Sequence, residues 1–395
     1  MADRYWIGDG GSWADTAHWS ASSGGAGGET APGINDAAFF DSNSFTTGGQ
    51  TVTADAVSIL LRTMDWTGVT NSPTFANGTV SSFSVSRDLI FSTAMTVSLT
   101  GPSSVRAFTG SEPPAGTYTV DLGSGMPSAI FLIDGRSDVT RNIVRNIDVS
   151  RLDLGVGTIE FNNYSVDAGA LRIESTSSIY NFGTSQITLG GFNLFSGRII
   201  SIRGTTPTFN GTPNFILNGG GIIYSDTASS SLYYVLVNGS FVTFNLNGFT
   251  TIETLEVASG SLLKFTSNTT TTTVTFIANG SPSNLITINS TTSGIQGVIY
   301  SSSPSVSYID VKDSYADGNI PFYNIPGGVD SRNNTNWAFP GAEDFQEIDN
   351  TIGFKGWYRV TPAQLIIYTT DEGSSVDGVN TGKIKGSYKI LKNKT

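Results

Sequence analysis

The amino-acid sequence predicts an all-β protein built as a parallel, right-handed β-solenoid, in which the chain winds through stacked coils of short strands. Three observations favour this class. β-Rich runs recur at a fixed step, the composition suits strands and tight turns, and apolar residues often alternate with polar ones. No segment between residues 50 and 310 shows the period of an amphipathic helix.

The fixed step lies in residues 214–281, where four short runs share one pattern. They align, 20 residues apart, on Leu217, Val237, Val257 and Ile277. Such a step is typical of a solenoid, so we expect these four side chains to point into the core from successive coils. Division of residues 50–310 by this step predicts roughly 13 coils and a rod on the order of 60 Å long. The period is blurred between residues 100 and 210, where we expect loops or irregular coils.

Asn218 and Asn238 occupy equivalent offsets in this repeat, and each precedes a glycine. Two interpretations remain open. The amides stack and hydrogen-bond from coil to coil, as in cross-β ladders, or each Asn-Gly pair is a simple turn with positive φ.

The composition narrows the class of protein. Gly accounts for 46 of 395 residues and aromatic residues for 11%, which favours strands and turns. The net charge of −11 without basic clusters argues against nucleic acid as a partner.

The chain has no Cys, so it has no disulfide and no thiol chemistry. Its start lacks the pattern of a signal peptide and no apolar run approaches about 20 residues, so we expect neither export by the usual route nor membrane insertion.

Four parts follow from these patterns: an N-terminal aromatic cap (1–50), the β-solenoid (51–340), a linker (341–353) and a small β module (354–395). The cap holds Trp6, Trp13, Trp19 and the single His18. Such a cluster favours a plug over the open end of the solenoid, because an end coil otherwise exposes its core. The alternative is that the three Trp rings form a platform that contacts glycans.

Both ends of the solenoid resemble a known family. The matching segments are YWIGDGGSW (5–13), TAHWS (16–20), GGAGG (24–28), NDAAFFDSNSF (35–45), SYIDVKDS (307–314) and DSRNNTNW (330–337). They are similar to the opening and closing segments of a family of β-helical proteins from tailed bacteriophages and from the surfaces of some bacteria. The resemblance implies a β-helix and a virion or surface setting, and it implies no catalytic residues.

The final part differs in charge from the rest. Residues 354–395 contain seven Lys and Arg against three Asp and Glu, a net +4 that leaves −15 on the remaining chain. Three or four antiparallel strands are expected here. A basic module on an acidic rod is suited to attachment to an acidic partner, through Trp357, Arg359, Lys383, Lys385 and Lys389. The alternative is that these Lys residues only protect edge strands from aggregation.

Little in the sequence points to chemistry. One His and no Cys exclude a multi-His metal site and a Cys nucleophile. The densest acidic patch comprises Asp134, Asp138, Asp148 and Asp153. Its spacings do not match one coil and four Arg residues lie nearby, which favours solvated ion pairs over paired catalytic acids.

A second polar cluster offers oxygen ligands of the kind that Ca²⁺ prefers. It comprises Asp310, Asp313, Asp317, Asp330 and Asn333. Its spacing is not that of an EF-hand loop. We therefore expect no catalytic residue, no metal and no cofactor.

These observations predict a non-enzymatic structural protein of a tailed-phage virion, made in the host cytoplasm. It is a capsid decoration or head-fibre protein, or part of a tail fibre. Its expected partners are other capsid or tail proteins and host surface glycans, with homo-oligomerisation open. The alternatives are a polysaccharide depolymerase on a β-helix and a bacterial surface adhesin.

Overall fold

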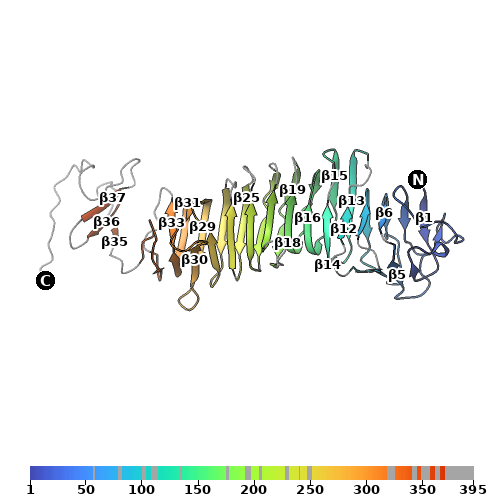
Figure 1. Cartoon of the computed structure of the whole chain (residues 1–395), viewed down its shortest axis with the longest axis horizontal. Helices are drawn as coiled ribbons and strands as arrows, with labels where there is room; N and C mark the ends of the chain where they lie inside the picture. Colours follow the sequence, from blue (N-terminus) through green and yellow to red (C-terminus); the bar gives the residue numbers. More distant parts are fainter. Residues whose placement is uncertain are drawn as a thin grey trace.

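Short strands from successive segments lie parallel to one another and build an elongated stack, shown by the computed structural model in Figure 1. The structure describes residues 1–56, 58–78, 82–99, 104–107, 114–133, 136–174, 178–191, 197–203, 207–226, 231–239, 241–246, 251–317, 325–339, 345–347, 356–360 and 365–369. These residues form an all-β fold with long parallel sheets, an arrangement compatible with a β-solenoid. They contain no α-helix, as expected, and their one helical turn is the 3₁₀ turn η1 (Thr16–His18).

The strands form three ladders along the stack, and each level of the stack is called a layer below. The first ladder runs through β1 (Asp3–Trp6), β4 (Ala37–Phe39), β7 (Thr63–Asp65), β10 (Leu89–Phe91), β13 (Gly116–Leu122), β15 (Val139–Ile143), β17 (Thr158–Glu160), β19 (Ile179–Gly183) and β22 (Thr208–Gly211). All its neighbours are parallel except β3 (Trp19–Ser20), which pairs antiparallel with β1 at the outer edge.

The second ladder begins with β2 (Gly11–Ser12), β5 (Thr51–Ala54), β8 (Thr74–Asn77) and β11 (Thr96–Ser98). Next along the stack come the first parts of β14 (Met126–Ile133), β16 (Ile147–Leu154) and β18 (Val166–Glu174), whose later parts belong to the third ladder. They are followed by β20 (Gln186–Leu189), β23 (Asn214–Leu217) and the later halves of β25 (Ser231–Val237), β27 (Thr251–Val257), β29 (Thr270–Asn279) and β31 (Gly297–Ser307). The first halves of these last four strands continue the face of the first ladder, and β33 (Ser314–Asp317) follows them.

The third ladder contains thirteen described strands. They are β6 (Ile59–Leu61), β9 (Ser82–Val85), β12 (Ser104–Ala107), β14 (Met126–Ile133), β16 (Ile147–Leu154), β18 (Val166–Glu174), β21 (Arg198–Arg203), β24 (Gly221–Ser225), β26 (Phe241–Leu246), β28 (Leu262–Phe265), β30 (Ile286–Ser290), β32 (Ile309–Lys312) and β34 (Val329–Asp330). At about 4.8 Å between neighbours, this ladder is roughly 58 Å long. Both values agree with the expectation from the 20-residue step.

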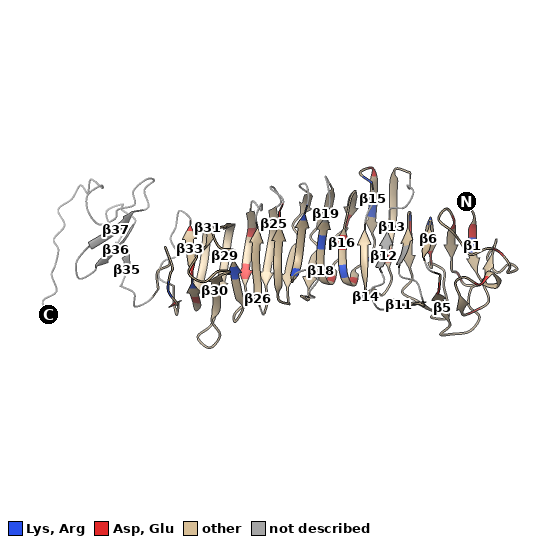
Figure 2. Ribbon diagram, in the orientation of Figure 1, with Lys and Arg blue, Asp and Glu red and all other residues tan. Residues whose placement is uncertain are grey.

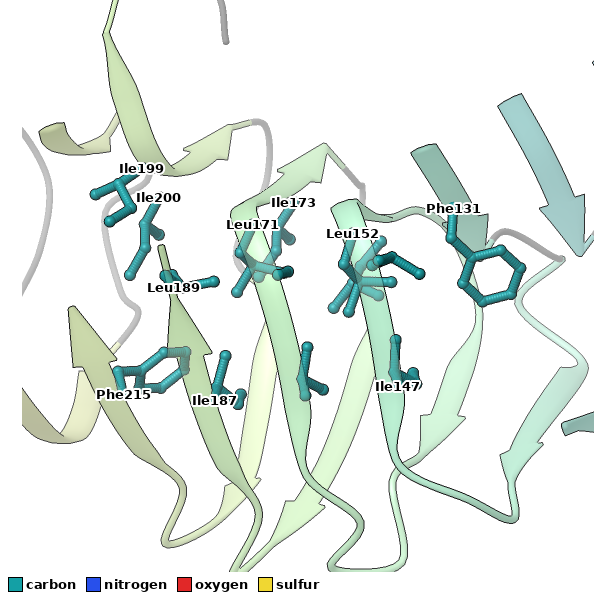
Figure 3. Close-up of a cluster of buried hydrophobic side chains, with 14 of the residues drawn as sticks. Phe131, Ile147, Leu152, Leu171, Ile173, Ile187, Leu189, Ile199, Ile200 and Phe215 are labelled. Atoms are coloured by element: carbon teal, nitrogen blue, oxygen red, sulfur yellow. The ribbon is translucent and has the colours of Figure 1, made fainter. Parts of the chain in front are cut away.

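The core is continuous between the ladders. Figure 3 shows part of it, where side chains from β14, β16, β18, β20, β21 and β23 meet. Leu152, Ile173 and Ile202, each at most 2% exposed, belong to successive strands of the third ladder. Alternation places such residues inside and polar residues outside. Each fully buried aliphatic side chain stabilises the stack by roughly 1.5–3 kcal/mol.

The expected alignment of the repeat is correct for three of its four residues. Leu217 pairs with Val237 and Val237 with Val257 in adjacent layers, and all three are buried. The next partner is Ala278, however, while Ile277 is only half-buried. The prediction for Ile277 is therefore wrong by one residue, because the layer between Val257 and Ala278 contains 21 residues.

The blurred stretch also has a physical cause. Paired residues of the third ladder are separated by 26 residues between Ala107 and Ile133 and by 29 between Ile173 and Ile202. The strands thus stay in register although the layers differ in length, because the additional residues lie between strands. The sequence period is lost while the ladder remains.

Stacked Asn side chains are present. Asn238 Nδ2 donates to Asn218 Oδ1 at 2.9 Å across adjacent layers. Asn210 and Asn181, and Asn162 and Asn142, make equivalent bonds at 2.7 Å. Gly239 also has a φ of +94°, so at this position the Asn ladder and the turn occur together.

The shifted register predicts losses of very different size for substitutions at two neighbouring residues. Ala278→Asp should reduce the free energy of unfolding by more than about 3 kcal/mol, because it buries an unpaired charge. Ile277→Asp should cost about 1 kcal/mol or less, because this side chain lies at the surface. Urea unfolding followed by circular dichroism measures both. A larger loss for Ile277→Asp than for Ala278→Asp would restore the uniform 20-residue alignment.

Candidate functional site

The three N-terminal Trp side chains lie inside the stack. Trp6, Trp13 and Trp19 are at most 2% exposed. Trp19 packs edge-on against Trp6 and Trp13, with ring centroids 5.1 and 4.8 Å apart. Phe40 stacks on Trp66 at 3.5 Å and extends the cluster into the core. No indole face is open to solvent, which argues against the glycan platform.

His18 is part of the same packing. Its ring stacks on Trp6 at 4.6 Å with an interplanar angle of 3°, and Nδ1 lies 2.8 Å from the carbonyl oxygen of Ile7. A Cβ on Gly11 would collide with the imidazole, so glycine is needed for this close approach. His18, the only His of the chain, is therefore part of the packing of this N-terminal cluster.

Asp9 ties the start of the chain to the loop after β4. Its carboxylate accepts hydrogen bonds from the amides of Thr46 and Thr47 at 2.6 and 3.0 Å. The Thr46 hydroxyl donates to it as well, at 2.7 Å. These bonds lower the pKa of Asp9, the Thr46 hydroxyl having the largest effect.

The acidic patch does not come together as one site. Asp134 lies outside the described residues. Asp138 forms an exposed ion pair with Arg136 at 2.6 Å. Asp153 is only 2% exposed and lies between Arg151 and Arg172, at 2.7 and 2.9 Å. Asp138 is therefore held in a solvated ion pair, as expected from the sequence. Asp153 is also held by Arg partners, but its ion pairs are buried rather than solvated.

Asp148 has a different neighbour. It is exposed on β16 and stands in register with exposed Asp167 on β18. Burial raises the pKa of Asp148, and the charge of Asp167 adds to this effect. Asp167 was absent from the predicted patch. Its separation of 19 residues from Asp148, close to one repeat, is the sequence signal for this pair.

The polar cluster near the end of the stack uses its oxygens internally. Asp310 accepts from the Ser331 hydroxyl at 2.6 Å, and Asp313 accepts from Asn333 Nδ2 at 2.7 Å. This bond from Asn333 is the main cause of a lowered pKa at Asp313. Within the described ranges, no group of three or more His, Cys, Asp or Glu residues is placed to hold a metal ion.

The small C-terminal sheet is described at the level of its backbone. β35 (Phe345–Glu347), β36 (Gly356–Val360) and β37 (Leu365–Thr369) pair antiparallel. β35 falls within the range expected as a linker. Trp357 and Arg359 lie on the central strand β36, and the positions of Lys383, Lys385 and Lys389 are outside the described residues.

A surface depression lies beside β22, the last strand of the first ladder among the described residues. β22 pairs with β19, and no described strand pairs with its other edge. On the next layer, the start of β25 pairs with β27 only. The depression between β22 and β25 has a volume of about 280 Å³, and its lining includes Phe209, Pro213, Phe215, Tyr233 and Glu253.

Two pairs of Tyr and Glu lie near one another on this surface. Tyr234 donates its hydroxyl to Glu256 Oε2 at 2.6 Å, and burial together with this bond raises the pKa of Tyr234 to about 12. Tyr233 and Glu253 are exposed, and neither has a polar partner in the described part of the chain. Sequence analysis missed this second pair, although its separation equals the 20-residue step.

The environment of Asp153 leads to a prediction. Asp153→Asn should reduce the free energy of unfolding by about 3 kcal/mol, because it leaves two closely packed Arg side chains without their anion. Asp138→Asn, which breaks an exposed pair, should cost less than about 1 kcal/mol. Thermal and urea unfolding measure both variants. Equal stabilities of the two variants would show that Asp153 is not a structural anion.

Comparisons with known proteins found no relative of this chain. No protein-family model matches the chain, and no curated protein or solved structure shows significant similarity to it. The resemblance of both ends to a phage and bacterial surface family therefore rests on the motifs quoted above.

Proposed function

We propose that this chain is a right-handed β-solenoid that serves as a rigid, non-enzymatic rod on a tailed-phage particle. The observation that carries the proposal is the thirteen-strand third ladder packed on a continuous core. Bending such a stack separates paired backbone groups and opens the core, both of which cost free energy. The hand follows the strong preference of parallel crossover connections.

The N-terminal segment suits an end cap. β3 runs antiparallel to β1 at the outer edge of the first ladder and so ends the parallel pairing. The buried Trp cluster fills the adjacent end of the core. Edge strands otherwise promote pairing between molecules, so a capped end keeps rods separate.

The virion setting rests on the family resemblance and on charge. The described rod carries few charged side chains, scattered along its length in Figure 2. The net charge of the chain is −15 over residues 1–353 and +4 over residues 354–395. A basic module on an acidic rod suits attachment to an acidic capsid or tail protein. The outer faces then remain free for host glycans.

One observation favours the depolymerase as a second candidate. Asp148 and Asp167 are exposed in register on adjacent strands, so two carboxylates lie on the same face in neighbouring layers. Retaining and inverting glycosidases both act through such a pair of acidic side chains. Turnover of host capsular polysaccharide that is lost in both Asp148→Asn and Asp167→Asn would replace the structural proposal.

Removal of the C-terminal module tests the attachment role. A chain ending at residue 344 lacks β35 together with β36 and β37, and it should keep the circular dichroism spectrum of the rod, because the ladders and core lie before this point. It should fail to enter particles when it replaces the full chain during phage assembly. Immunoblots of purified particles measure incorporation, with Asp138→Asn full-length chain as the control. Normal incorporation of the shortened chain would exclude the module as the attachment point.

Removal of the cap tests the end-cap role. A chain starting at residue 37 lacks β1, β2 and β3 and exposes the edge of β4 and the core beneath it. We expect it to associate end to end and to unfold at lower temperature than the full chain, as measured by analytical ultracentrifugation and calorimetry. A shortened chain that stays monomeric and equally stable would show that the segment is no cap.

A further inference from the structure

We propose that the depression between β22 and β25 binds one uncharged sugar ring of a glycan. The proposal deepens the glycan contact of the proposed rod and rests on that function for its biological setting. It also replaces the N-terminal Trp residues, which are buried, with an accessible aromatic side chain elsewhere on the molecule.

The floor of the depression is apolar and fixed. Phe209 packs on Tyr180 and Phe182, with ring centroids 5.9 and 5.8 Å apart. Phe215 and Leu232 line the same space and are each 1% exposed. The floor therefore belongs to the core, and a ligand finds it already formed.

The rim combines an aromatic ring with a carboxylate. Asn214 is in register with Tyr234, and Tyr234 with Thr254. The residues just before these three, Pro213, Tyr233 and Glu253, thus follow one another in adjacent layers, about 4.8 Å apart. Tyr233, with 47% of its surface exposed, stands between the proline and the carboxylate.

This combination suits a sugar. The C–H face of a pyranose packs on an aromatic ring, while its hydroxyl groups need acceptors beside that ring. The Glu253 carboxylate offers two oxygens and, among the described residues, has no partner that occupies them. The adjacent Tyr234 is by contrast already bonded to Glu256 and holds the strand in place.

Charge and size define the ligand further. Among the described residues that line the depression, Glu253 is the only carboxylate and no basic side chain is present, so acidic sugars are repelled. The volume of about 280 Å³ lies just below the range of roughly 300–1,000 Å³ for small-ligand sites. One ring fits, and single-site binding is expected to be weak, with a Kd of about 1 mM. Several copies on a particle raise the effective affinity through multivalency.

Saturation-transfer NMR of the full chain tests the site, with glucose, galactose, N-acetylglucosamine and their tetramers as probes. Transfer to at least one uncharged probe is expected, with little to glucuronic acid. Tyr233→Ala should weaken binding at least about fivefold, and Glu253→Gln should change the preference between charged and uncharged probes. Tyr164→Ala removes another exposed tyrosine, far along the chain, and should leave binding unchanged.

Two results overturn the proposal: no transfer to any uncharged probe, or binding that is equal in Tyr233→Ala and Tyr164→Ala. Circular dichroism of each variant confirms that its fold is intact. An intact rod that binds no sugar rejects this site alone and leaves the structural role in place. Failure of the proposed function is seen separately, as the absence of the full-length chain from immunoblots of purified phage particles.

Discussion

The structure depends on one constraint: each layer must present its backbone in register with the layer before it. Parallel pairing links every strand of the third ladder to its neighbours, and a slip by one residue moves inward side chains to the surface. The chain meets this constraint with layers of unequal length. Additional residues lie between strands, so the inward stripe of Leu, Ile, Val and Phe stays continuous.

The same constraint creates a problem at the ends. A parallel stack leaves unpaired backbone groups and open core at its first and last layers. At the N-terminal end the chain reverses into antiparallel β3 and fills the core with Trp, Phe and His rings. Near β34, polar side chains such as Asp313 and Asn333 bond to one another across layers. The sequence motifs had marked residues at both ends. In the structure these residues pack against or hydrogen-bond to other residues of the protein.

The contacts on the surface depend on which outward side chains the stacked layers bring together. Outward positions one repeat apart become neighbours, which brings Asn218 to Asn238 and Tyr233 beside Glu253. It also brings Asp153 against Arg172, where an ion pair stabilises the stack. Beside such a column, between β22 and β25, lies a surface depression whose lining includes residues of the core such as Phe215. The proposed sugar site is therefore built from residues of adjacent layers.

The sequence by itself determined the all-β class, the lack of α-helix among the described residues, the approximate number of layers and the inward positions of Leu217, Val237 and Val257. These follow from periodicity, which is a local property. Only the tertiary structure decided that Ala278 replaces Ile277, that the Trp rings are buried, and that Asp148 meets Asp167. The physical reason is that layer length varies by several residues, so neighbours across a ladder are known only once the backbone is paired.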